Sequence, residues 1–184
     1  MKRSTLILVA ALIGVAAACT KQSLQNTYDK QTTYIENFIA ARMKADTNAT
    51  LVRNGGAYRV NLHDTLPQQR DSLRRGQKVS LYYGCFTLTS ASLSSSNLVS
   101  TNLKELAEQA KWTLSDTTRF KLDTLLLDNS LVTGLADGLV GVQPRDEGYI
   151  LFTGKYGYGK QERGMIPALS ALAYYFWIEE IINE

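Results

Sequence analysis

The stretch Leu131-Val132-Thr133-Gly134-Leu135-Ala136-Asp137-Gly138-Leu139, followed by Gly148-Tyr149-Ile150-Leu151-Phe152, decides the fold. Residues 131–142 are typical of a compact helical segment, in which Gly134 and Gly138 allow close approach of another part of the chain. Pro144 and Gly148 bound a turn, and the apolar and aromatic run at 149–152 predicts a strand. The sequence therefore predicts a short helix followed closely by a strand.

Further strands are expected on both sides of this unit. Residues 78–88 are rich in β-branched and aromatic side chains and predict a long, half-buried strand. A turn at Asn54-Gly55-Gly56 leads into a short strand at 57–62, and another extended piece begins at 120–125. Residues 171–182 fit helix or strand by periodicity alone, and the propensities of residues 174–178 favour strand. Asn102 is expected to cap a helix over residues 103–112.

The segment before these elements carries one amphipathic pattern. Tyr34, Ile35, Phe38, Ile39, Arg42 and Met43 follow a spacing that places one apolar stripe along a helix. We expect this helix, over residues 28–43, to dock on the domain. Residues 20–27 are polar and lack such a pattern, which is typical of a tether.

The first residues have the pattern of an export signal. Lys2 and Arg3 precede a short apolar run, which ends in small residues at 16–18 immediately before Cys19. This arrangement resembles a bacterial lipobox, although Ala16 stands where leucine is commoner, and it predicts cleavage before Cys19 and acylation of its sulfur. Two or three acyl chains would hold the protein firmly on a bilayer. The alternative is a soluble secreted protein whose cysteine falls near the cut by chance.

Composition excludes several classes of function. Without Lys2 and Arg3 the basic residues barely outnumber the acidic ones, so no basic excess for nucleic acid remains. Cys85 lies in an apolar segment and is interpreted as a small buried hydrophobe, with a reactive thiol as the alternative. His63 is the only histidine and lies in a segment typical of a surface loop. The sequence predicts no cofactor and no metal site.

Several segments in a fixed order carry a resemblance. They are the segments at 131–139 and 148–152 quoted above, Lys155-Tyr156-Gly157-Tyr158-Gly159, Met165-Ile166-Pro167 and Leu172-Ala173-Tyr174. In this order, the five segments resemble the C-terminal half of the FKBP-type peptidyl-prolyl isomerases. Upstream, residues 79–84 are similar to that family's Val-x-Tyr-x-Gly strand, and residues 98–102 to its Phe-Asp-Thr/Ser-Asn segment. The resemblance covers roughly residues 75–182. It implies an α+β fold, in which a twisted antiparallel sheet wraps around one short helix and leaves an apolar cup, here with an extra N-terminal helix and a helical insertion.

The resemblance also implies the site. Tyr82, Tyr158, Ile166 and Tyr174 would act as the catalytic residues of the cup, with the Tyr158 hydroxyl as a donor toward a substrate carbonyl. The expected substrate-binding residues are Val99, Val132 and Leu135. Three positions depart from the family pattern: Leu135 replaces the floor tryptophan, Ser100 an aspartate and Val99 an aromatic residue.

These features predict four regions. Residues 1–18 are a lipoprotein signal peptide, 19–27 a tether, 28–74 an N-terminal helix and strand extension, and 75–184 an FKBP-like domain. The expected location is the cell envelope, on the periplasmic face of an outer membrane. Three triplets, at 64–66, 71–73 and 123–125, are similar to O-glycosylation sites of Bacteroidetes.

Three functions are compatible with this organisation. The first is an envelope isomerase or folding helper that acts on Pro-containing exported polypeptides. The second is a non-catalytic module that binds a peptide or partner, either in the same cup or on the insertion at residues 90–112. The third is a structural component of the envelope, in which the N-terminal helix packs against another envelope protein.

Overall fold

The computed structural model describes residues 2–62, 71–115 and 117–182, with side chains from residue 21 onward. Three α-helices, seven strands and one 3₁₀ turn follow one another in this part of the chain. In chain order they are α1 (Lys2–Ala45), β1 (Thr50–Asn54), β2 (Ala57–Asn61), β3 (Lys78–Thr87), η1 (Ser95–Asn97), β4 (Leu98–Thr101), α2 (Lys104–Gln109), β5 (Asp123–Leu126), α3 (Thr133–Leu139), β6 (Glu147–Phe152) and β7 (Leu172–Ile182).

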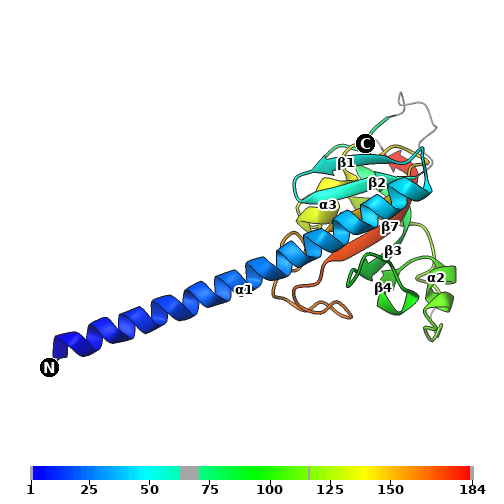
Figure 1. The fold of residues 1–184 in the computed structure, drawn as a ribbon. Coiled ribbons are helices and arrows are strands. Elements are labelled where there is room, and N and C mark those ends of the chain that lie inside the picture. The colour runs from blue at the N-terminus through cyan, green and yellow to red at the C-terminus, as the bar shows by residue number, and fades with distance from the viewer. Residues whose placement is uncertain (1, 63–70, 116, 183–184) are drawn as a thin grey trace.

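The strands form one antiparallel sheet in the order β1-β2-β6-β7-β3-β4, with β5 paired to β3 (Figure 1). The two longest strands, β3 and β7, pair along their whole length from Lys78–Ile182 to Thr87–Leu172. The predicted strands at 57–62, 78–88, 149–152 and 171–182 are confirmed. Strand β1 was not predicted, and it completes a hairpin with β2 around Gly55, whose φ of +55° suits glycine.

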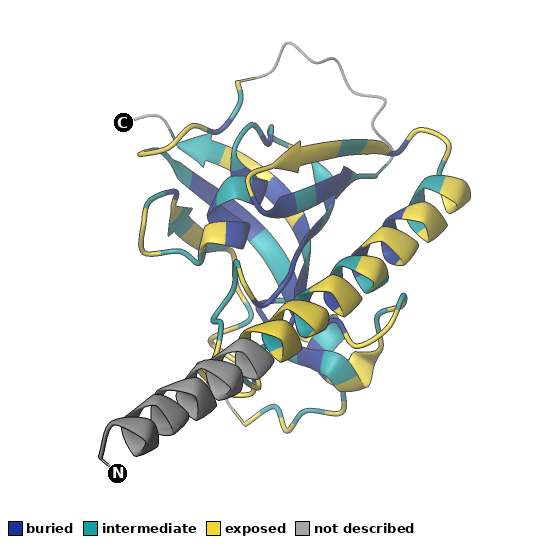
Figure 2. Cartoon of the chain, turned by 60° about the vertical axis from the view of Figure 1, so that its left-hand side comes forward, coloured by how far each residue is buried: buried dark blue, intermediate teal, exposed yellow. Residues whose placement is uncertain are grey.

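Both faces of the sheet are buried, by different helices. On β6, Ile150 and Phe152 belong to the core beneath α3, whereas Tyr149 and Leu151 belong to the core beneath α1. This alternation follows from the period of two along a strand. Figure 2 shows α1 lying across the sheet with its buried residues turned toward the strands. We call the face beneath α3 the inner face and the face beneath α1 the outer face.

Helix α3 lies unusually close to β6. A Cβ atom at Gly134 would lie 2.2 Å from the Phe152 ring, and one at Gly138 would lie 2.2 Å from Cγ2 of Ile150. Because both distances are far below van der Waals contact, only glycine permits this approach. The expected role of the two glycines is confirmed.

The apolar stripe of α1 docks as expected. Ile35 and Phe38 are fully buried, and the Phe38 ring meets Tyr149 edge-on at a centroid distance of 5.0 Å. Residues 20–27, which were expected to form a tether, continue the same helix instead. Exposed polar side chains such as Gln22 and Gln25 bond four residues along it, which supports the helix. In the described part of the chain, no helix has the length and apolar content that a membrane span requires.

The predicted helix at 103–112 is shorter in the structure, and its cap differs. Helix α2 covers Lys104–Gln109 and has Leu103 at its N-cap. The Asn102 amide instead donates to the Leu81 and Lys121 carbonyls, at 3.0 Å each, and its oxygen accepts from Tyr83 N–H. Asn102 therefore joins β3 to the loop before β5 and does not cap the helix.

Some expectations fall outside the described residues. His63 and the triplet at 64–66 lie there, as does the side chain of Cys19. The other two triplets are described: Ser72 is half-buried and Thr124 is exposed.

A buried arginine closes the C-terminal end of α3. Nη1 of Arg59, on β2, donates to the carbonyls of Gly138 at 2.9 Å and Val140 at 2.7 Å. These carbonyls belong to the last turn of the helix, where no intrahelical donor remains and a positive charge is favourable. Arg59 is only 6% exposed, so its loss would leave these acceptors without a donor.

We therefore expect Arg59→Met to lower the free energy of unfolding by about 2 to 3 kcal/mol, because hydrogen bonds from a charged group are lost. Arg53→Met is the matched control, since Arg53 lies on the neighbouring strand and stacks on Tyr58 in solvent. Urea unfolding followed by circular dichroism measures both. Equal stability losses in the two variants would contradict the role assigned to Arg59.

Candidate functional site

A cavity of about 430 Å³ opens on the inner face between α3, β3, β7 and the loop that follows β6. We call it the cup. Its walls are mainly apolar and aromatic, with two hydroxyls from serine and one guanidinium. The lining residues are Leu81, Tyr83, Cys85, Val99, Ser100, Leu125, Ser130, Leu131, Val132, Leu135, Tyr158, Arg163, Gly164, Met165, Ile166 and Tyr174.

The rings of Tyr83 and Tyr174 form one wall of the cup. The Tyr174 ring stacks on Phe152 at 6.0 Å and lies 6.1 Å from the Tyr83 ring. Tyr83 is held in place because its hydroxyl and that of Ser100 lie 3.2 Å apart, within hydrogen-bond distance. The wall is therefore anchored by the β3–β4 pair and by the core beneath it.

Tyr158 presents the free polar group of the cup. Its hydroxyl forms no hydrogen bond with another described residue, and its ring lines the cavity. Burial, followed by nearby Cys85, raises the pKa of Tyr158 above its ordinary value, although Arg163 opposes the shift. The hydroxyl therefore stays protonated at neutral pH and is available as a donor.

Cys85 lies beneath this wall and is chemically quiet. The side chain is fully buried, and burial raises the pKa of its thiol to about 12. A thiol with so high a pKa is not a nucleophile at neutral pH. The interpretation of Cys85 as a buried hydrophobe is therefore favoured. Among the described side chains, no group of three His, Cys, Asp or Glu residues could hold a metal.

The loop that carries Tyr158 is held by the N-terminal helix. The Gln31 side chain of α1 accepts from Gly154 N–H at 2.9 Å and donates to the Leu169 carbonyl. Leu169 N–H in turn bonds to the Gly159 carbonyl at 2.6 Å. Both ends of the loop are thus fixed to the same side chain, which is only 8% exposed.

Six of the seven predicted cup residues come together. Tyr158, Ile166, Tyr174, Val99, Val132 and Leu135 all line the cavity. Tyr82 does not: Leu81, Tyr83 and Cys85 line it, so the period of two along β3 turns Tyr82 to the outer face. Aligning Gly84 with the glycine of the family's Val-x-Tyr-x-Gly strand placed Tyr82 at the tyrosine of the cup. In the structure Tyr83, one residue later, occupies this position.

Sequence reasoning missed Tyr83, Ser130, Arg163 and Met165. A signal for Tyr83 was present, because Val79, Leu81 and Cys85 alternate as apolar residues and share its face. Arg163 and Met165 gave no such signal, since both are exposed loop residues. Arg163 is the only charged residue among the described residues that line the cup.

No protein-family model and no curated protein matches this sequence. Solved structures do show a similar fold. The three FKBP domains of wheat FKBP73 are 11% identical at a TM-score of 0.56. The match covers 74% of this chain and 52% of that one, so the chain spans about half the length of the solved three-domain chain.

Two bacterial structures are also similar. A peptidyl-prolyl cis-trans isomerase from Pseudomonas syringae pv. tomato is 11% identical at a TM-score of 0.55, covering 86% of this chain and 96% of its own. FkpA from Escherichia coli is 10% identical at a TM-score of 0.54, covering 98% of this chain and 73% of its own. The chain therefore has an FKBP-like α+β fold, with an additional N-terminal helix packed on the outer face of the sheet.

Proposed function

We propose that this chain is a peptidyl-prolyl cis-trans isomerase that acts on Pro-containing exported polypeptides. The observation that carries the proposal is an accessible apolar cup with one unpartnered hydroxyl, that of Tyr158, among its described residues. Six residues expected for such a cup meet there, although they are distant in sequence. The FKBP-like fold supports the same activity.

The chemistry needs neither a base nor a cofactor. Rotation about an X-Pro bond must overcome a barrier of about 18 to 20 kcal/mol, which arises from amide resonance. The twisted amide has lost this resonance and its charge separation, so an apolar cavity favours it over the planar form. A pocket complementary to the twisted form therefore accelerates the reaction.

Within this proposal the described residues divide the work. Leu135, only 6% exposed, forms an apolar floor for the proline ring, and Ile166 and Tyr174 form its sides. The Tyr158 hydroxyl donates to a carbonyl of the substrate and so holds the peptide across the mouth of the cup. Met165 is 60% exposed and extends the apolar surface at the rim.

The second candidate is a non-catalytic module that binds proline-containing segments in the same cup. Leu135 and Ser100 favour it, because they replace the tryptophan and the aspartate of the family pattern. A leucine floor offers less contact area to a proline ring than an indole does. Binding without rate enhancement separates this candidate from the isomerase.

We expect the wild-type protein to accelerate isomerisation of a short X-Pro peptide and Tyr158→Phe to lower kcat/KM about two- to tenfold, the effect of one neutral hydrogen bond. Tyr82→Phe is the matched control, since Tyr82 faces away from the cup. NMR exchange spectroscopy on the peptide measures the rates. Equal losses in both variants would contradict the role of Tyr158, and a folded wild type that binds the peptide without acceleration would favour the second candidate.

We also propose that the protein is exported and lipid-anchored through Cys19 on the periplasmic face of an outer membrane. The charged, apolar and small-residue order of residues 2–18 supports export and acylation, and the absence of an acidic run at residues 20–23 favours the periplasmic face. Residues 21–30 of α1 are mostly exposed and helical. At a rise of about 1.5 Å per residue, they would hold the domain roughly 15 Å from the lipid as a stalk.

Growth with an alkyne-labelled fatty acid tests the anchor. We expect the label on the wild type and on Cys85→Ala, and its loss in Cys19→Ser, because Cys19 and Cys85 are the two cysteines of the chain. The readout is in-gel fluorescence after click coupling. Label that persists in Cys19→Ser would overturn the proposal.

A further inference from the structure

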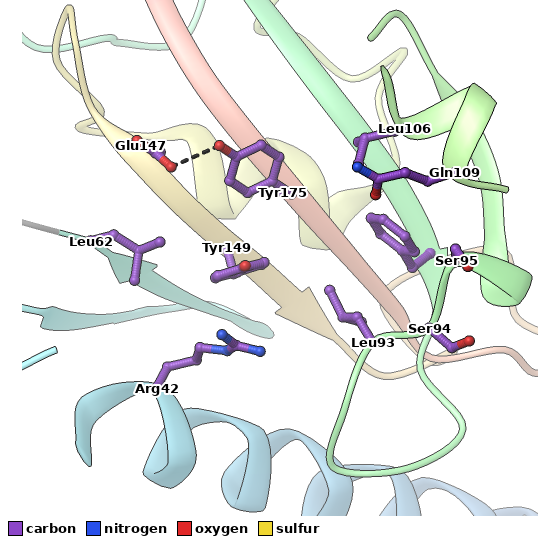
Figure 3. Close-up of a pocket in the computed structure, with 11 residues that line it drawn as sticks. Arg42, Leu62, Leu93, Ser94, Ser95, Leu106, Gln109, Glu147, Tyr149 and Tyr175 are labelled. Atoms are coloured by element: carbon purple, nitrogen blue, oxygen red, sulfur yellow. Dashed lines mark hydrogen bonds between the residues drawn. The ribbon is translucent and has the colours of Figure 1, made fainter. Parts of the chain in front are cut away.

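A second cavity, of about 470 Å³, lies on the outer face of the sheet (Figure 3). We call it the outer groove. It is bounded by the C-terminal part of α1, by α2 and by the loop before β4. The lining residues are Arg42, Leu62, Phe86, Leu93, Ser94, Ser95, Leu106, Gln109, Glu147, Tyr149 and Tyr175. Its volume falls within the range of about 300 to 1,000 Å³ that is typical of ligand pockets.

The outer groove is separate from the cup. Tyr174 lines the cup and Tyr175 lines the outer groove, so adjacent residues of β7 face the two cavities. Neighbouring side chains on a strand point to opposite faces of the sheet. A ligand in one cavity therefore leaves the other accessible.

A cation without a counter-ion among the described residues lies at one end of the outer groove. The Arg42 guanidinium packs against Phe38 at 5.0 Å and against Tyr149 at 5.4 Å. It forms no hydrogen bond or ion pair with another described residue, and its Nε is buried without a partner. The two ring contacts hold the guanidinium in place, and its Nη1 and Nη2 atoms keep their hydrogens for an anion.

Among the described residues that line the outer groove, the one carboxylate, that of Glu147, is already engaged. Glu147 accepts a hydrogen bond from the Tyr175 hydroxyl at 2.7 Å, and Figure 3 shows this pair on the other side of Tyr149 from Arg42. Burial, and then this bond, raise the pKa of Tyr175, so the hydroxyl remains a donor to Glu147. Glu147 would repel a second carboxylate placed beside it, which directs an incoming anion to Arg42.

Between these charges the walls suit a short peptide. Leu62, Leu93 and Leu106 offer apolar contact. At the mouth, the Ser95 hydroxyl and the Gln109 amide are exposed and form no side-chain hydrogen bond with a described residue. The Ser95 hydroxyl and the Gln109 amide can each donate and accept hydrogen bonds, as the amide groups of a peptide backbone do. A hydrocarbon chain could form no hydrogen bond with them.

We propose that the outer groove binds the C-terminal end of a polypeptide whose last residues are apolar. The terminal carboxylate pairs with the edge of the Arg42 guanidinium, where two parallel hydrogen bonds give a strong and directional contact. The last side chain packs against the leucines, and the preceding amide meets Ser95 and Gln109. This use of the outer face does not depend on the activity of the cup.

Fluorescence anisotropy with a labelled hexapeptide that ends in Leu-Leu tests the proposal on the mature protein. We expect the free acid to bind, and the C-terminal amide to bind about tenfold more weakly because the charged contact is lost. Arg42→Gln should weaken binding of the free acid by a similar factor. Arg53→Gln is the matched control and should bind as the wild type, as should Tyr158→Phe.

The comparison of acid with amide uses the wild type alone, so it holds even if Arg42→Gln alters the fold. Equal affinity for acid and amide would overturn the proposal, as would no binding at all. Octanoate and unlabelled peptide would also be compared as competitors. If both displaced the labelled peptide at the same concentration, the proposal would be overturned, because the groove would then bind simple aliphatic acids.

Discussion

The structure depends on a sheet that must bury both of its faces. Side chains alternate along each strand, so β6 sends Ile150 and Phe152 to one side and Tyr149 and Leu151 to the other. Neither apolar face is stable in water without a cover. Helix α3 covers one face and the C-terminal part of α1 the other, and each covers only part of its face. The cup and the outer groove lie where these covers end.

The close packing of α3 sets the depth of the cup. Gly134 and Gly138 allow the helix to lie against β6, and this position brings Leu135 to the floor of the cavity. Arg59, on β2, holds the C-terminal end of α3 through hydrogen bonds to the Gly138 and Val140 carbonyls. The N-terminal helix also reaches the site, because Gln31 fixes both ends of the loop that carries Tyr158. The extra helix is thus part of the support of the cup.

Much of this arrangement could be predicted from the sequence. Strong periodicity and propensity identified the long strands, and the ordered family segments identified six cup residues. The register of β3 was misread because Tyr82 and Tyr83 are chemically equivalent, although the alternation of Val79, Leu81 and Cys85 marks the face of Tyr83. Contacts between distant segments, such as Gln31 with Gly154, leave no local pattern. The insertion at residues 90–112 was expected as an alternative binding place, but the outer groove that it forms with α1 and β7 was not, for the same reason.

The central claim is that the cup receives the proline of a substrate peptide. Isotope-filtered NMR on the complex with a proline-containing tetrapeptide tests it directly, through nuclear Overhauser effects between the proline ring and protein methyl groups. We expect effects to the methyls of Leu135 and Ile166, with none to Leu93 of the outer groove. Effects to Leu93 alone, or a folded protein with no effects to the cup, would contradict it.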